Sequence, residues 1–224
     1  MKIPSGGLVV TRMLFLAFWA VVPPASGQAG SGSNGWVKVS DLRVGDVLLQ
    51  PLDCKLCTMI EEEEGSRFSH IGVVLSTGAQ VRVAEAYGSV RAVPLTVFDS
   101  KTERGLGLLV LRFRNTALQE RFQSEAGRFQ AIYSRDFDGA RYDSEFRWNN
   151  IDSNGREKLY CSELVSKLFQ AFAGIEVPVK RMHFERNREA WVRFFKGNVP
   201  DGLPGNSPET FRQSDLFLEV GELR

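Results

Sequence analysis

A hairpin pattern in the first half of the chain constrains the fold more than any other feature. Residues 69–87 read SHIGVVLSTGAQVRVAEAY, two runs rich in β-branched residues on either side of a short turn that contains glycine. This composition is typical of an antiparallel β-hairpin. Whether the turn has two residues or the four residues TGAQ, the register pairs Gly72 with Glu85. Because side chains alternate between the faces of a strand, His70 then lies diagonally from Glu85 on the same face. An odd-length loop or a bulge would shift the register and separate these two side chains.

The rest of the chain contributes further strands and then helices. Strands are expected where β-branched runs lie between turn residues, and helices where apolar residues recur at helical spacing. The expected strands are residues 44–49, 106–113 and 215–220, and the expected helices are residues 118–133 and 161–173. The acidic run 61–64 is interpreted as a solvated helix end or loop. This order predicts an α+β fold, with a small antiparallel sheet or barrel packed against helices.

The N-terminal segment has the pattern of a secretory signal peptide. Lys2 and Arg12 precede the apolar run 13–22, which is followed by two prolines and small residues. A basic region, an apolar region and small residues at the cleavage point are typical of exported proteins. An uncleaved membrane anchor is the alternative, although the run is short against the roughly 20 residues of a membrane-spanning helix. The chain is therefore expected to comprise a signal peptide (residues 1–27), a flexible leader (28–35) and a single domain (36–224), located in the periplasm or outside the cell.

The charge of the chain limits its partners. The 28 Lys and Arg residues almost balance the 27 Asp and Glu residues, for a formal net charge of +1. Nucleic-acid-binding domains usually carry a strong basic excess, so no nucleic acid partner is expected. The sequence leaves the oligomeric state open.

Cys161 is the first candidate for a reactive group. It lies in EKLYCSELVSKLF (residues 157–169), where a polar stretch gives way to the helical pattern. The N–H groups and the partial positive charge at a helix N-terminus stabilise a thiolate, and also the oxyanion of an acyl-transfer intermediate. The alternative is a small core residue, since free cysteine is among the most buried residue types.

A thiol nucleophile needs a base, and the chain offers two histidines. His183 lies in the basic and aromatic segment 180–196, which resembles an exposed amphipathic helix. His70 lies at the mouth of the hairpin, where the register places Glu85 beside it. A carboxylate in that position fixes the imidazole tautomer and favours the imidazolium ion. The alternative for Glu85 is a glutamate on an edge strand that faces water.

Cys54 and Cys57 form a C-x-x-C motif. One such pair is not enough for a tetrahedral zinc site, and the βαβ pattern around a thioredoxin-like redox site is missing. In an exported chain, a local disulfide or two partly buried thiols is expected instead. If these two cysteines pair, Cys161 is the odd thiol left over.

Five motifs of the chain are VGDVLLQ, EEGSRFSHIGVV, VAEAYGSV, ARYDSEFRWNN and EKLYCSELV. In this order they resemble the YiiX-like (YaeF/YiiX) family of permuted papain-like amidases, within the NlpC-type cysteine peptidase superfamily. The resemblance covers residues 42–175. In the ordinary papain-like arrangement the cysteine precedes the histidine, whereas His70 here precedes Cys161, as in the permuted branch.

The resemblance implies a thiol hydrolase that needs no metal or organic cofactor. Cys161 would be the nucleophile, His70 the base and Glu85 the residue that orients the base. Supporting or substrate-binding roles are implied for three further residues: Tyr160, Tyr142 and Asp143.

The expected reaction is cleavage of an amide bond, in a peptidoglycan peptide or a related small amide, through an acyl-enzyme. A lipid acyl hydrolase or acyltransferase with the same triad is an alternative. Relatives in the superfamily act on lipid acyl groups, and segment 180–196 has the composition of a surface that contacts anionic lipid. A non-catalytic envelope binding module is the third possibility.

Overall fold

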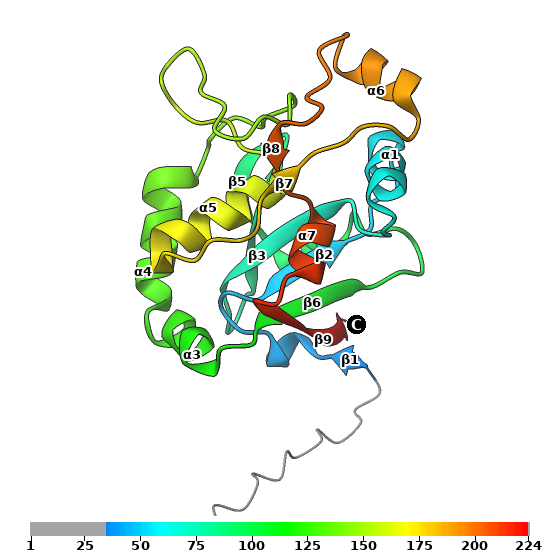
Figure 1. The fold of residues 1–224 in the computed structure, drawn as a ribbon. Helices are drawn as coiled ribbons and strands as arrows, with labels where there is room; N and C mark the ends of the chain where they lie inside the picture. Colours follow the sequence, from blue (N-terminus) through cyan, green and yellow to red (C-terminus); the bar gives the residue numbers. More distant parts are fainter. Residues whose placement is uncertain (1–34, 224) are drawn as a thin grey trace, which may run out of the picture. The chain divides into compact units, whose positions relative to one another are not determined.

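A seven-stranded sheet organises the described residues. The computed structural model describes residues 35–223, so the expected signal peptide and most of the expected leader lie outside the described residues. The strand order is β1-β9-β6-β2-β3-β4-β5, and all neighbours are antiparallel except β1 and β9 (Figure 1). A mainly antiparallel sheet packed against helices confirms the predicted α+β fold. The sheet is open, so of the two expected forms it is the sheet and not the closed barrel that is present. The strands are β1 Trp36–Val37, β2 Val47–Gln50, β3 His70–Ser76, β4 Arg82–Tyr87, β5 Ser89–Pro94, β6 Leu108–Phe113 and β9 Phe217–Leu223, with β7 Lys180–Arg181 and β8 Pro204–Gly205 in a separate pair.

The helices follow the sequence pattern where a long apolar stripe exists. The expected helix 161–173 is present and ends at Gly174 in the left-handed conformation. The expected helix 118–133 is instead broken at Glu125 into two helices, whose Phe122 and Phe129 rings meet edge to face at 5.0 Å. Within residues 35–223, none of the helices is long and apolar enough to cross a membrane. The helices are α1 Lys55–Glu64, α2 Leu95–Asp99, α3 Thr116–Ser124, α4 Ala126–Ile132, α5 Cys161–Ala173, α6 Arg188–Phe194 and α7 Pro208–Gln213, with a 3-10 turn at Val39–Asp41 and a π-helical turn at Tyr133–Phe137.

The predicted hairpin forms between β3 and β4, with the expected pairing of Gly72 and Glu85. The turn differs from the prediction, because the register shifts by one residue before Ser76 and the loop 77–81 has an odd length. The bulge and the odd loop each change the register by one residue, so their effects cancel at the far end of the hairpin. β5 forms hydrogen bonds with the other edge of β4, so Glu85 lies on an interior strand and not on an edge strand.

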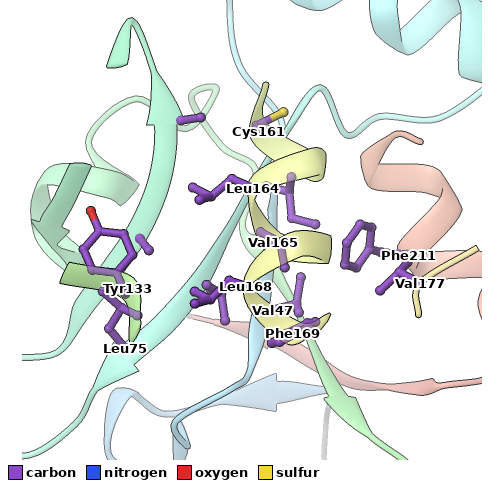
Figure 2. Close-up of a cluster of buried hydrophobic side chains, with 14 of the residues drawn as sticks. Val47, Leu75, Tyr133, Cys161, Leu164, Val165, Leu168, Phe169, Val177 and Phe211 are labelled. Atoms are coloured by element: carbon purple, nitrogen blue, oxygen red, sulfur yellow. The ribbon is translucent and has the colours of Figure 1, made fainter. Parts of the chain in front are cut away.

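Helix α5 carries much of the main apolar core and fixes the position of its own first residue. Leu164 and Leu168 are fully buried, and Figure 2 shows them along a helix that lies between Leu75 of β3 and Phe211 of α7. Each fully buried side chain of this size stabilises the fold by roughly 1.5–3 kcal/mol. Because these contacts follow the whole length of the helix, they hold Cys161 at its N-terminal end against the sheet.

The basic and aromatic segment 180–196 is not the exposed amphipathic helix that its sequence predicts. Only α6 is helical, and Phe184 and Trp191 are buried in an apolar cluster of their own. Glu63, in the last turn of α1, holds this segment by accepting hydrogen bonds from two of its backbone N–H groups at 3.1 and 2.8 Å and from the Trp191 indole at 3.2 Å. The acidic run therefore anchors a neighbouring segment, and the aromatic rings gain more from burial than from exposure at a surface.

Candidate active site

Cys161 is the first residue of α5 and is 8% exposed. Burial raises the pKa of the Cys161 thiol to about 11, although the backbone N–H groups of Ser162 and Ile71 favour the thiolate. The stabilising effect of the helix N-terminus is present, but the cost of removing a charged sulfur from water is larger. The resting thiol is therefore neutral, in contrast to the thiolate expected from its position on the helix.

His70 opens strand β3, one residue before the Ile71 N–H group, and it lines the same pocket as Cys161. Its side chain is buried between two aromatic rings, stacked on Phe98 with the ring centroids 5.6 Å apart and in edge contact with Tyr87 at 5.7 Å. Burial lowers the pKa of the His70 imidazole, and this effect outweighs the opposing influence of Glu85. The imidazole is therefore neutral at neutral pH, as a base must be before it accepts a proton.

Glu85 fixes which nitrogen of His70 is available. The two side chains form a hydrogen bond of 2.8 Å between His70 Nε2 and Glu85 Oε2. An ionised carboxylate only accepts hydrogen bonds, so Nε2 carries the imidazole proton. This leaves Nδ1 with a free electron pair as the nitrogen that can take a proton from a thiol. The hairpin register thus brings His70 and Glu85 together as predicted, while their catalytic roles remain predictions.

Two cations at Glu85 were not predicted from the sequence. Arg91 pairs directly opposite Glu85 on β5 and donates from Nε and Nη2 to Oε1 at 3.1 and 2.9 Å. Lys101, shortly after α2, donates to both carboxylate oxygens at 2.8 and 2.9 Å. Burial on its own raises the pKa of Glu85, but the hydrogen bonds and charges of His70 and Lys101 lower it to about 2. The β-branched run SVRAV after Gly88 was the signal for β5 and hence for Arg91; for Lys101 the sequence holds no comparable signal.

The three residues given supporting roles separate into two groups. Tyr160 and Tyr142 line the pocket beside Cys161. Asp143 is fully buried outside the pocket lining, where it accepts hydrogen bonds from the backbone N–H groups of residues 145 and 147 and from the Asn150 amide at 3.0, 2.8 and 2.8 Å. Asp143 therefore organises the loop before α5, which fits a supporting role, and a role in substrate binding stays a prediction.

Cys54 and Cys57 form a disulfide at the start of α1, with their Cα atoms 5.0 Å apart. This bond lines the pocket, and Cys161 remains the free cysteine. His183 lies at the rim of the same pocket with 62% of its side chain exposed, and its Nδ1 is 4.0 Å from Glu185 Oε1. Of the two histidines, His70 is thus the one with a buried carboxylate partner.

The pocket that joins these residues has a volume of about 400 Å³. It is lined by Cys161 and His70, and also by residues of α1 and of the segment around α6. Its walls are mainly apolar, with contributions from Leu52, Leu56, Ile60, Phe146, Met182, Phe184 and Trp191. Cys161 therefore lines a mainly apolar pocket, which is typical of small-molecule binding sites.

The fold and the site define a class. A cysteine at the first residue of a helix, packed against a sheet whose strand presents a buried histidine, is the arrangement of papain-like cysteine hydrolases. The chain belongs to the family of permuted papain-like amidase enzymes (YaeF/YiiX, C92 family), whose model matches residues 41–215. This confirms the family resemblance and the assignment as a cysteine amidase or peptidase.

Two proteins of Escherichia coli are similar to this chain. The uncharacterized protein YiiX of strain K12 is 26% identical over 135 residues, which cover 60% of this chain and 61% of that protein. A crystal structure described as metalloprotein YiiX from strain O157:H7 has a TM-score of 0.64 at 24% identity and covers 80% of this chain and 97% of that chain. It shows the same fold. In the part of this chain that the structure describes, no group of three or more His, Cys, Asp or Glu side chains is arranged to hold a metal ion.

Proposed function

We propose that the protein is an exported thiol hydrolase that cleaves an amide bond through an acyl-enzyme, with Cys161 as nucleophile, His70 as base and Glu85 as the residue that orients the base. One observation carries this proposal. Glu85 occupies Nε2 of His70 and leaves Nδ1 as the proton acceptor, in the pocket into which Cys161 opens. Membership of a cysteine amidase family supports the same reaction.

Acylation and deacylation each move one proton onto His70 and one proton off it. His70 Nδ1 takes the thiol proton as Cys161 Sγ attacks the carbonyl carbon, and the carbonyl electron pair moves to oxygen. Backbone N–H groups in the first turn of α5 stabilise this oxyanion. When the oxyanion collapses, the C–N bond breaks, His70 protonates the leaving amine and the acyl group stays on sulfur as a thioester. Water, deprotonated by His70, then releases the acyl group as a carboxylic acid and restores the thiol.

The electrostatics of the site favour proton transfer during attack over a preformed ion pair. Burial raises the pKa of Cys161 and lowers that of His70, so both groups rest in their neutral forms. The imidazolium ion forms only as the sulfur bonds to carbon. At that moment the Glu85 carboxylate, 2.8 Å from Nε2, stabilises the new positive charge.

The walls of the pocket suggest the kind of amide. A substrate with an apolar group next to the scissile carbonyl would bury that group against Phe146 and Met182, beside Tyr160. An N-acyl amide has this shape, and a peptidoglycan peptide has it only where an apolar side chain enters the pocket. The apolar lining also favours a second candidate reaction, hydrolysis or transfer of a lipid acyl group by the same triad.

Export is part of the proposal. The N-terminal segment has the signal-peptide pattern. A disulfide between Cys54 and Cys57 is consistent with an oxidising compartment, because thiols in the cytosol are usually kept reduced. Detection of the chain in periplasmic or extracellular fractions, shortened by the first 27 residues, tests this point.

The activity is tested with the mature chain, residues 28–224. We expect that incubation with N-acyl amides, peptidoglycan fragments and acyl lipids releases a new amine or acyl product, detected by mass spectrometry. Cys161→Ala should abolish this product while leaving the thermal unfolding transition unchanged within about 1 kcal/mol, since the lost thiol is small. Equal turnover by Cys161→Ala and the parent would exclude a thiol nucleophile. Product from peptidoglycan fragments alone would exclude the preference for an apolar acyl group.

A further inference from the structure

Glu85 has more positive charge around it than a histidine-orienting carboxylate requires. It is fully buried and bonds Arg91 and Lys101 as well as His70. The carboxylate and the two cations leave a net charge of +1 beside the imidazole before the imidazole takes any proton. Asp46 gives the contrast within the same chain, because this fully buried carboxylate bonds the single cation Arg112.

We infer that Arg91 and Lys101 are positioning residues of the proposed active site, a pair of cations that locks the Glu85 carboxylate in place and keeps His70 a neutral base. We call the two residues the Glu85 clamp. The inference rests on the proposed function, because it assigns His70 the role of base.

The clamp controls the orientation of the carboxylate through its hydrogen bonds. Arg91 holds Oε1 with two N–H groups, and Lys101 bridges Oε1 and Oε2. Oε2 is then the oxygen directed at His70 Nε2. Two N–H groups on one carboxylate oxygen, together with an ammonium that bridges both oxygens, restrict the rotation of the carboxylate more than a single hydrogen bond does. Without the clamp, the carboxylate would be freer to turn, and the hydrogen bond that orients the imidazole would be weaker.

The clamp also extends to the rings that surround the imidazole. The Lys101 ammonium lies 4.7 Å from the centroid of the Tyr87 ring and 5.4 Å from that of Phe98. These are the two rings that pack on His70. Lys101 is thus held by Glu85 and by both aromatic faces, which fits a residue whose position matters.

Electrostatics give the second consequence. Lys101 Nζ and His70 Nε2 bond the same oxygen, at 2.9 and 2.8 Å, so an imidazolium ion would lie close to an existing ammonium ion. Arg91 and Lys101 both lower the pKa of His70, in addition to burial. The charged or titratable groups around His70 in the described residues include Glu85 on β4, Tyr87 at the end of β4, Arg91 on β5, Lys101 after α2, Cys161 on α5, and Tyr142 in the lining of the same pocket.

The test is an NMR titration of the His70 imidazole. The chain has two histidines, so the mature protein with His183→Gln carries His70 as its one histidine signal. In this background His70 should titrate below its usual pKa of 6.5. Lys101→Met should raise the midpoint by about one pH unit. Arg91→Met should raise it by less, since 40% of the Arg91 side chain is exposed against 20% for Lys101. Lys101→Arg keeps the charge and should leave the midpoint near that of the parent.

Arg112→Met is the matched control, because it breaks a buried carboxylate–cation pair away from the pocket. An unchanged His70 midpoint in both Lys101→Met and Arg91→Met, or an equal shift in Arg112→Met, would overturn the inference. If Lys101→Met does not fold, Arg91→Met provides the test, because Arg91 is more exposed and its replacement should also raise the His70 midpoint. The titration requires neither substrate nor turnover. Turnover by Cys161→Ala would contradict the proposed function, whereas an unchanged His70 midpoint would contradict the clamp, so the two failures are distinguishable.

Discussion

Glu85→Gln is the substitution that separates the charge of this residue from its shape. Glutamine has nearly the same volume and is able to form hydrogen bonds with the same neighbours, but it carries no charge. In the structure, Oε1 and Oε2 of Glu85 accept hydrogen bonds from Arg91, Lys101 and His70. The variant therefore leaves two cations without their anion and changes the hydrogen-bonding requirement at His70.

The stability cost follows from the pKa of Glu85. The folded protein lowers it from 4.5 to about 2, which corresponds to about 3 kcal/mol in favour of the ionised side chain. A group whose pKa is lowered by folding contributes this stability above the unfolded pKa and loses it as the pH falls through the folded pKa. Part of this stabilisation comes from the imidazolium form of His70, which is present at low pH, so we expect Glu85→Gln to lose at most about 3 kcal/mol of unfolding free energy at pH 7. The difference from the parent should shrink as the pH falls from 4.5 towards 2.

The loss of activity follows from the tautomer. The amide oxygen of Gln at residue 85 is expected in the Oε1 position, where Arg91 and Lys101 donate three hydrogen bonds, because only one of these hydrogen bonds, from Lys101, reaches the Oε2 position. The NH₂ group then faces His70 Nε2 and donates to it. An Nε2 atom that accepts a hydrogen bond carries no proton, so the imidazole proton moves to Nδ1, which can no longer take the thiol proton. We expect turnover to fall on the order of 10²- to 10⁴-fold.

Urea unfolding at several pH values measures the first effect, and turnover of the substrate identified by mass spectrometry measures the second. Asp46→Asn is the control for the loss of a buried carboxylate, and it should leave turnover unchanged because Asp46 lies outside the pocket lining. Glu85→Gln with parental turnover and an intact fold would refute the tautomer argument. A stability loss that does not depend on pH between 7 and 2 would refute the electrostatic one.

Three further outcomes are expected. Alkylation of Cys161 by iodoacetamide in the substrate-free protein should have its midpoint well above the free-cysteine value of about 8.5, because burial raises the thiol pKa to about 11; a midpoint at or below that of a free cysteine contradicts this. Gly72→Ala should destabilise the fold by about 1–3 kcal/mol in urea unfolding, because a Cβ there would lie 2.6 Å from the Val83 side chain, and parental stability would be the contrary result. Replacing Cys54 and Cys57 by serine should lower the unfolding free energy by about 2 kcal/mol, as expected for so short a closed loop, and this loss should match that of the parent under a reducing agent.

Much of the site was accessible from local sequence patterns. The alternation of the hairpin predicted that His70 and Glu85 share a face, and the structure pairs Gly72 with Glu85. The apolar spacing from Cys161 onward predicted α5 with its correct bounds, because a long apolar stripe and Gly174 define a helix locally. The pairing of Cys54 with Cys57 was one of the two forms expected of this motif.

Other features depend on contacts between distant segments. The cations at Glu85 come from two elements further along the chain, and strand β5, which carries Arg91, was not predicted. The segment 180–196 has the composition of an exposed helix, yet Glu63 and a separate apolar cluster bury its aromatic rings. The β-branched run SVRAV was a local signal for strand β5, but no local pattern states that Lys101 reaches Glu85 or that Glu63 holds segment 180–196, because a sequence pattern does not state which surface a side chain will meet.

The sequence by itself determined which residue types are present, their order along the chain and the faces they occupy on their own strand or helix. These are local properties, set by side-chain alternation and helical spacing. Only the tertiary structure decided that Cys161 is buried enough to rest as a neutral thiol, and that Glu85 is shared by two cations as well as by His70. Burial and charge depend on everything packed around a group, so the protonation states of the site are a property of the whole fold.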